Sequence, residues 1–150
     1  MPSSWPPREF PHLTRWNHTD TSPQSRRYNC IAWAADNSTR WWWPDPANIG
    51  YWPPNIPRVE TVDTFVMAYA LQGYVTCQDS TLEAGIEKIA VYGLHVGGVV
   101  YPTHAARQLV DGKWTSKLGN FEDITHDTLD CLNGPRYGFP VCFLSRPRRG

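Results

Sequence analysis

Four cysteines and five histidines are the residues of this chain whose types could do nucleophilic or metal chemistry. The cysteines are far apart in sequence, so they form neither a CxxC pair nor a zinc-ribbon pattern: Cys30, Cys77, Cys131 and Cys142. No glycine loop has the spacing of a phosphate-binding motif. We therefore expect no metal site and no cofactor, which leaves the chemistry of a single thiol.

Cys30 is the strongest candidate for that thiol because of the element that it begins. Residues 28–35 predict a short helix with Asn29 as N-cap and Cys30 at the first helical position. Free backbone N–H groups and the helix dipole favour an anion there, and they can lower a thiol pKa from ~8.5 to ~3.5–7.5. The alternative is a small buried apolar side chain, as most free cysteines are.

His104 is the preferred general base. We expect it to open a strand over 104–109, which runs through the hairpin turn Asp111-Gly112 into a second strand over 113–118. A histidine at a strand end that faces a helix start can take the thiol proton and return it to a leaving group. The competitor, His95, is predicted in a loop, and the remaining histidines are expected to face solvent: His12, His18 and His126.

The elements that must position these residues predict an α+β domain. Residues 1–27 indicate an extended arm rich in proline, serine and arginine. A helix is predicted from its cap Thr61 to a stop at Gly73, and a capping box predicts a third helix over 81–86. Two further strands are expected over 89–92 and 137–144, the latter with Pro140 at an edge or a bulge. We predict one domain over 1–150, with a core over 28–144 and a basic tail over 145–150.

This order of elements resembles the papain-like superfamily, specifically the NlpC/P60-type cysteine peptidases and amidases. Asn29-Cys30 stands where that family has Asp-Cys, and the strand led by His104, with its Asp-Gly turn, stands where the family has its histidine hairpin. The strand over 89–92 leads into it, so the resemblance covers about residues 28–118. It implies a papain-like core in which the nucleophile helix packs on a small antiparallel sheet.

The resemblance also implies a third polar residue and an oxyanion site. The third residue would fall near Ser116, but serine is a poor orienter of imidazole, and Lys117 beside it would disfavour an imidazolium. Asn120 and Asp123, just past that strand, are the alternatives that would hold the histidine tautomer better. The N–H of Cys30 is a natural oxyanion donor, and two more residues are further candidates: Gln24 and Tyr28.

A loop rich in tryptophan and proline, residues 41–57, is the other strong feature of the sequence. Aromatic walls line grooves for sugars or proline-rich peptides, and Trp42 and Trp52 are our candidates for substrate contact. So many exposed rings would form an aggregation-prone patch. We therefore expect at least three of the five rings to pack onto the core: Trp41, Trp42, Trp43, Tyr51 and Trp52.

Charge and hydropathy exclude several classes of protein. Lysine and arginine number 14, as do aspartate and glutamate, so the chain lacks the basic excess of a nucleic-acid binder. The one basic cluster lies at the C-terminus, and we expect it to be a solvated tail: Arg146, Arg148 and Arg149. No apolar run reaches the ~18 residues of a membrane span, and the first residues do not form a secretory signal. We expect a cytoplasmic protein, or one exported by a route that reads no N-terminal signal.

The sequence thus predicts a thiol hydrolase. Cys30 would form an acyl-enzyme with His104 as acid and base, on a peptide or another amide, with a cell-wall peptide as one option. Peptidase, amidase and deamidase chemistry share this intermediate. A small papain-like domain also suits a bacterial effector or toxin, by analogy alone. The alternative is a non-catalytic binding or immunity-type module of the same fold, with a protein partner at loop 41–57.

Overall fold

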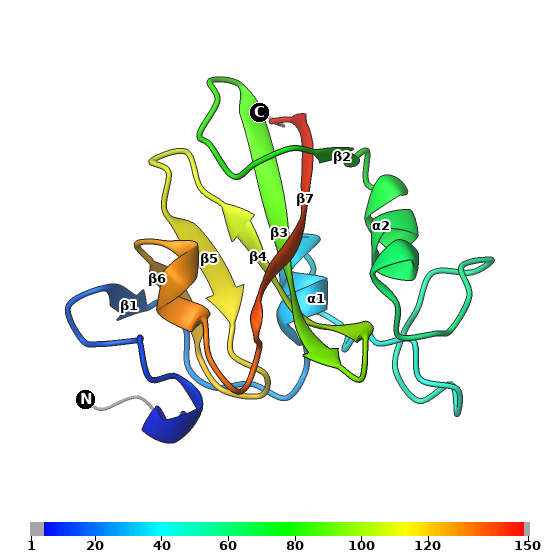
Figure 1. Cartoon of the computed structure of the whole chain (residues 1–150), viewed down its shortest axis with the longest axis horizontal. Coiled ribbons are helices and arrows are strands. Elements are labelled where there is room, and N and C mark those ends of the chain that lie inside the picture. The colour runs from blue at the N-terminus through cyan, green and yellow to red at the C-terminus, as the bar shows by residue number, and fades with distance from the viewer. Residues whose placement is uncertain (1–4, 149–150) are drawn as a thin grey trace.

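The chain is organised around one antiparallel sheet. The computed structural model describes residues 5–148, so the start of the predicted arm and Arg149 of the predicted tail lie outside it. Within that range seven strands pair in the order β1-β6-β5-β4-β3-β7-β2 (Figure 1). The strands are β1 (His18–Asp20), β2 (Val75–Cys77), β3 (Ile86–Val96), β4 (Val99–Gln108), β5 (Trp114–Lys117), β6 (Asp123–His126) and β7 (Phe139–Pro147).

Helical structure is limited to short elements. The α-helices are α1 (Cys30–Ala34) and α2 (Val62–Ala70), and the 3-10 turns are η1 (Pro7–Glu9) and η2 (Leu129–Leu132). The fold is therefore mainly β, and our prediction of an α+β domain with a papain-like core was wrong. The error lies in β1, β2 and β6, which are short and polar. They pair with partners distant in the chain, as His18 does with His126, and local sequence periodicity does not reveal such pairings.

Several predicted elements are confirmed. Helix α1 begins at Cys30, and the Asn29 side chain caps it by accepting a hydrogen bond from the Ala32 N–H at 3.2 Å. Helix α2 follows its predicted cap Thr61, whose hydroxyl accepts from a backbone N–H of the first turn. Strand β5 lies within the predicted 113–118, and Pro140 sits at a register shift of β7, as a proline in a sheet requires.

The predicted helix over 81–86 does not form. Lys88, at the start of β3, is almost fully buried, and its ammonium binds the carboxylates of Asp79 and Glu83 at 3.2 and 2.7 Å. These two ion pairs hold the segment from Asp79 to Glu83 over the buried ammonium of Lys88, and this segment has no regular secondary structure. A long-range requirement for charge compensation thus overrides the local capping signal.

The β4–β5 hairpin forms, but with a different turn. A two-residue Asp-Gly hairpin turn needs positive φ at both residues, whereas of Asp111 and Gly112 only Gly112 has it, at 90°. The turn closes when the Gly112 N–H donates to the Leu109 carbonyl at 3.0 Å, and Leu109 N–H then bonds the Lys113 carbonyl. A left-handed glycine at the end of a longer turn is the usual geometry of a bulged hairpin.

The sheet separates two apolar clusters. Alternate residues of a strand face opposite sides, so Ala105 packs with the helices in the first cluster while Ala106 packs in the second. The first cluster contains α1, α2 and most of loop 41–57. The second is completed by residues of the predicted arm, which are buried there: Trp5, Phe10 and Leu13. At the other end of the chain Arg146 is also buried, in an ion pair with Glu87.

Candidate functional site

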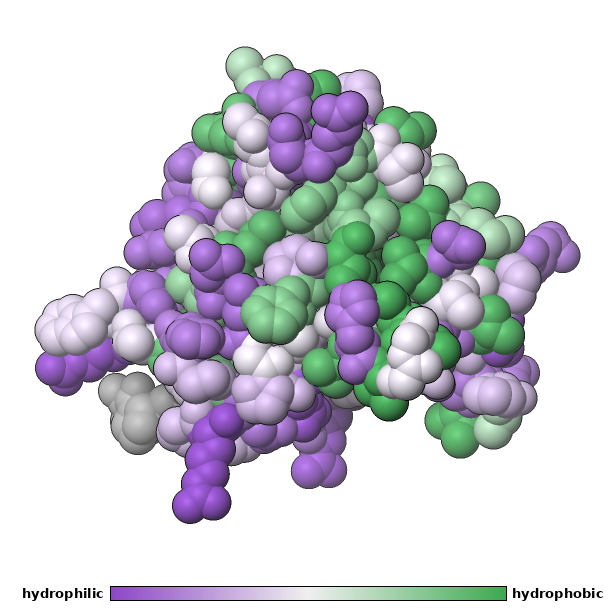
Figure 2. Space-filling model, in the orientation of Figure 1, coloured by the Kyte–Doolittle hydropathy of each residue, from purple (hydrophilic) through white to green (hydrophobic). Residues whose placement is uncertain are grey.

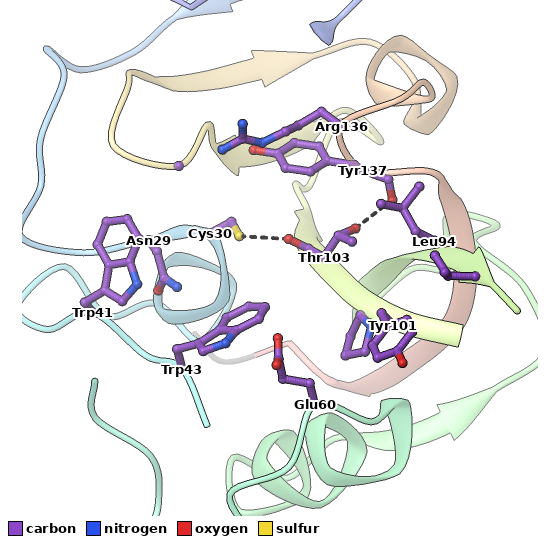
Figure 3. A pocket seen from close by; sticks show the side chains of 13 residues that line it. Asn29, Cys30, Trp41, Trp43, Glu60, Leu94, Tyr101, Thr103, Arg136 and Tyr137 are labelled. Atoms are coloured by element: carbon purple, nitrogen blue, oxygen red, sulfur yellow. Dashed lines mark hydrogen bonds between the residues drawn. The ribbon is translucent and has the colours of Figure 1, made fainter. Parts of the chain in front are cut away.

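A cleft of about 600 Å³ opens at the start of α1. Apolar residues gather on this side of the molecule, between the sheet and α2, as Figure 2 shows. The walls come from loop 41–57, the β3–β4 hairpin and the segment before β7 (Figure 3). The lining residues are Asn29, Cys30, Trp41, Trp43, Glu60, Leu94, Val96, Tyr101, Pro102, Thr103, Gly119, Arg136 and Tyr137.

Cys30 sits at the inner end of this cleft against the edge of β4. Its sulfur lies 4.0 Å from the Thr103 carbonyl oxygen, to which the thiol donates (Figure 3), and it also faces the Ala105 N–H. These are the peptide groups on either side of His104. Near His104 this edge of β4 has no paired strand within residues 5–148, because β4 pairs with β5 only at Arg107 and Gln108. Helix α1 packs into the opening between the two strands.

Burial decides the protonation state of this cysteine. The side chain is 5% exposed, and the loss of solvent raises the pKa of the Cys30 thiol to about 11. Backbone N–H groups of Ala105 and Ile31, and the ammonium of Lys117, oppose this rise without cancelling it. The depressed pKa that we expected at a helix start is not found, since α1 has five residues and buries its first turn. Cys30 is therefore a neutral thiol at pH 7.

His104 lies within β4 and is completely buried. Its Nε2 is 2.9 Å from the Ser116 hydroxyl, which is in turn 2.8 Å from Nε2 of His126. The other nitrogen of His126, Nδ1, is 2.8 Å from the Thr128 carbonyl oxygen. The His104 ring stacks on Tyr137, with ring centroids 4.1 Å apart. Two histidines, one serine and one carbonyl thus form a continuous chain of hydrogen bonds.

The direction of this chain follows from its carbonyl end. A carbonyl oxygen can accept but not donate, so His126 carries its proton on Nδ1 and its Nε2 accepts from Ser116. The Ser116 oxygen then accepts from Nε2–H of His104. The lone pair of His104 is consequently on Nδ1, which is buried and has no hydrogen-bond partner in the described part of the chain. An unpaired basic nitrogen of this kind is unusual in a protein interior.

Both imidazoles are neutral. Burial lowers the pKa of His104 well below its usual range, with a smaller contribution from His126. Burial also lowers the pKa of His126 to about 4, against the opposing hydrogen bond to Thr128. Our prediction that His126 faces solvent was therefore wrong. Its sequence neighbours are polar, but its pairing with Trp114 on β5 turns the side chain into the second cluster.

The other residues predicted to assist catalysis lie elsewhere. In the described part of the chain Ser116 is the hydrogen-bond partner of His104, and neither Asn120 nor Asp123 takes that place. Asp123 instead accepts from the Tyr28 hydroxyl at 2.6 Å, and burial together with that bond raises the pKa of Tyr28 to about 12. Gln24 is exposed and does not line the cleft.

Lys117, which we considered only for its effect on the imidazolium, is a charged neighbour of Cys30. Its ammonium is buried and donates to the carbonyls of Ser25 and Gly119, with the Tyr28 ring 5.1 Å away. Burial lowers the pKa of Lys117 to about 8, while Asp123 and Cys30 act in the opposite direction. The Lys117 ammonium therefore titrates at about pH 8, and it lies close in space to the Cys30 thiol.

Loop 41–57 packs largely as expected. Trp42 and Trp52 are buried in the first cluster, so the two rings that we selected for substrate contact do not line the cleft. Trp43 and Tyr51 pack against the same cluster, which confirms that at least three of the five rings belong to the core. The rings of this loop that do line the cleft are those of Trp41 and Trp43.

Residues 5–148 contain neither a cluster of metal ligands nor a helix that could span a membrane. No group of three or more histidine, cysteine, aspartate or glutamate side chains in that range could hold a metal ion. No helix within the same residues is both long and apolar enough to cross a bilayer.

Similarity to known proteins is found at the level of a family model. Comparison with curated proteins and with solved structures finds no significant match. A family model does match residues 19–145, a range that contains Cys30, His104, Ser116 and His126. Because this match covers most of the sequence, the chain belongs to the DUF7689 family, a domain of unknown function.

Proposed function

We propose that the cleft is the active site of a cysteine-dependent hydrolase of amide bonds, with Cys30 as nucleophile and Nδ1 of His104 as base. The main support is the buried Nδ1 lone pair, left without a partner on a residue whose two flanking peptide groups contact the Cys30 sulfur. A cysteine at a helix start followed by a histidine strand is also the part of the resemblance to NlpC/P60-type enzymes that this proposal uses.

The proposed reaction passes through a thioester. The Cys30 sulfur forms a bond to the substrate carbonyl carbon while its proton passes to Nδ1 of His104. The same proton is then given to the leaving nitrogen as the C–N bond breaks, which releases an amine and leaves the acyl group on sulfur. Water attacks the thioester with His104 again as base, and the products are a carboxylic acid and the restored thiol.

Two features suit a neutral starting pair. Because burial raises the pKa of Cys30 and lowers that of His104, a thiol and an imidazole are the resting forms, and charge appears during attack. The ammonium of Lys117 then favours the developing negative charge on sulfur. Backbone N–H groups at the start of α1 are the natural donors to the oxyanion, as expected for a helix start.

Acylation by p-nitrophenyl acetate tests this proposal without knowledge of the natural substrate. We expect an acetyl thioester on Cys30, detected by mass spectrometry of the intact protein and its peptides, with release of one equivalent of p-nitrophenolate. His104→Ala should slow this step by about 10²- to 10⁴-fold, the usual contribution of a general base.

Cys131 is the internal control because it is as buried as Cys30, at 4% against 5% exposed, but its sulfur contacts the Thr128 hydroxyl and does not line the cleft. It should stay unmodified under the same conditions. Equal labelling of Cys30 and Cys131, or an unchanged rate in His104→Ala, would show that Cys30 is an ordinary buried thiol and would reject the proposal.

A further inference from the structure

The cleft contains two charged side chains that differ in their pairing. Arg136, on the wall next to Tyr137, is neutralised by Glu9, whose carboxylate accepts from its guanidinium at 2.5 Å. Glu60, on the opposite wall, forms no ion pair within residues 5–148. Among the residues that line the cleft, the charge without an ion-pair partner within residues 5–148 is therefore the negative charge of Glu60.

Aromatic rings stand beside this carboxylate. Glu60 points into the cleft between Trp43 and Tyr101, as Figure 3 shows, with Trp41 further along the same wall. Tyr101 and Trp41 are 42% and 36% exposed, so their faces remain open to a ligand. Trp43 is held from behind by Phe65, with ring centroids 5.5 Å apart. A carboxylate flanked by aromatic faces is the arrangement that binds organic cations.

We propose that this wall is a subsite for a cationic group of the substrate, such as the ammonium of a lysine-like side chain, bound by Glu60, Trp43 and Tyr101. The inference rests on the proposed function, since it assigns the ligand of the same cleft. The cation would lie on the α2 side of Cys30, and the scissile carbonyl would lie at the sulfur. Apolar residues of the β3–β4 hairpin, Leu94 and Val96, would contact the aliphatic part of such a chain.

Charged thiol reagents test the subsite without requiring turnover. Methanethiosulfonates can transfer an aminoethyl, trimethylammonioethyl or sulfonatoethyl group to sulfur, which differ in charge, and a neutral methyl group is the small reference. We expect Glu60→Gln to lower the ratio of cationic to anionic labelling at Cys30 by about five-fold, a typical effect for an exposed cation site. The effect should shrink in high salt because the carboxylate is exposed. The two cationic reagents separate a primary ammonium site from a quaternary one.

Asp63→Asn is the matched control. Asp63 is an exposed carboxylate in the first turn of α2, three residues from Glu60, and it does not line the cleft. Its removal changes the net charge equally and should leave the labelling ratio unchanged. An equal shift in both variants, or no shift in Glu60→Gln, would overturn the subsite.

A binding measurement covers the case in which Cys30 reacts with none of these reagents. N-acetyl-lysine amide should quench tryptophan fluorescence of the Cys30→Ala protein more strongly than its neutral isostere N-acetyl-norleucine amide, and Glu60→Gln should remove the difference. Equal quenching would reject the subsite. Failure of the proposed function is separate, because it shows as the absence of a Cys30 acetyl thioester.

Discussion

Ser116 and Lys117 are neighbours on β5, yet they belong to two buried networks of opposite character. Ser116 faces the second cluster and joins two neutral imidazoles. Lys117 faces the other side of the sheet, where its ammonium meets carbonyl oxygens, the Tyr28 ring and the field of Asp123. Both side chains are fully buried. One strand thus takes part in a neutral network on one face of the sheet and in a charged network on the other. Under the proposed function, the first acts on Cys30 through His104 and the second acts through the charge of Lys117.

The contrast shows two ways to influence a buried cysteine. The neutral network fixes the direction of its hydrogen bonds from the Thr128 carbonyl, so it determines which nitrogen of His104 is basic. It carries no charge, and its members satisfy one another except at Nδ1 of His104, which is buried without a partner among the described residues. The charged network supplies a positive field but fixes no proton position. Its burial lowers the pKa of Lys117 to about 8, so its charge is held only weakly.

Loss of the neutral network should have the larger effect. Ser116→Ala removes the group that fixes the His104 tautomer and leaves ring nitrogens on both histidines unpaired. We expect acetylation of Cys30 by p-nitrophenyl acetate to slow by about 10³-fold, as when a catalytic histidine loses its orienting partner. Burst kinetics measure this rate.

Thr115→Ala is the control for that variant. Thr115 is the adjacent residue of β5, and its hydroxyl accepts from Trp33 Nε1 at 2.9 Å on the other face of the sheet. Its loss should lower the free energy of unfolding by about 1 kcal/mol and change acetylation less than ten-fold. Similar rates in the two variants would mean that the Ser116 network does not act on His104.

Acid should destabilise the neutral network next. The pKa of His126 is lowered to about 4 by burial, and that of His104 is lowered well below its usual range, whereas both are near 6.5 in the unfolded chain. The unfolded state therefore binds more protons between these values, and stability present above pH 6.5 is lost as the pH falls to about 4. His126 alone accounts for about 3 kcal/mol of this loss.

Urea unfolding at pH 7, 5.5 and 4 measures that loss. A free energy of unfolding that stays constant over this range would contradict the assignment of two buried neutral imidazoles.

Loss of the charged network should have the smallest effect. Lys117→Met removes the positive field near the sulfur, so the pKa of Cys30 should rise further. We expect alkylation of Cys30 by iodoacetamide at pH 7.5 to slow about five-fold, the size of one charge interaction in a partly shielded site. Peptide mass spectrometry follows the rate for each cysteine.

Lys88→Met is the matched control because Lys88 is also buried and pairs with carboxylates far from the cleft. It should lower stability without slowing Cys30. If Lys88→Met slows Cys30 as much as Lys117→Met does, general destabilisation rather than the field of Lys117 explains the effect.

Local signals in the sequence were sufficient to predict the helix that begins at Cys30. Asn29 caps the helix at which Cys30 stands, Thr61 caps the second helix, and the aromatic rings of loop 41–57 fill the core. Each of these depends on residues a few positions apart. Capping and hydrophobic burial are local enough to be recognised without a structure.

The hydrogen-bond partners of His104 depend on contacts across the sheet, and local signals in the sequence do not reveal such contacts. Serine alone is a weak orienter, and Ser116 acts as one because His126 stands behind it, ten residues later in the chain. His126 in turn is buried because β6 pairs with β5 and β1, both short strands of polar sequence. The same pairings make the fold mainly β, so the error in fold class and the error at His126 have one cause.

The burial of Trp5, Phe10 and Leu13 bears on where the folded unit of this chain begins. The region that the family model matches begins at residue 19, but these three side chains fill the second cluster. There the Phe10 ring contacts the Tyr137 ring, which in turn stacks on His104. In this chain the region that the family model matches is therefore smaller than the unit that folds. A fragment trimmed to that region would expose the apolar surface behind the histidine, and its insolubility would say nothing about the chemistry of the cleft.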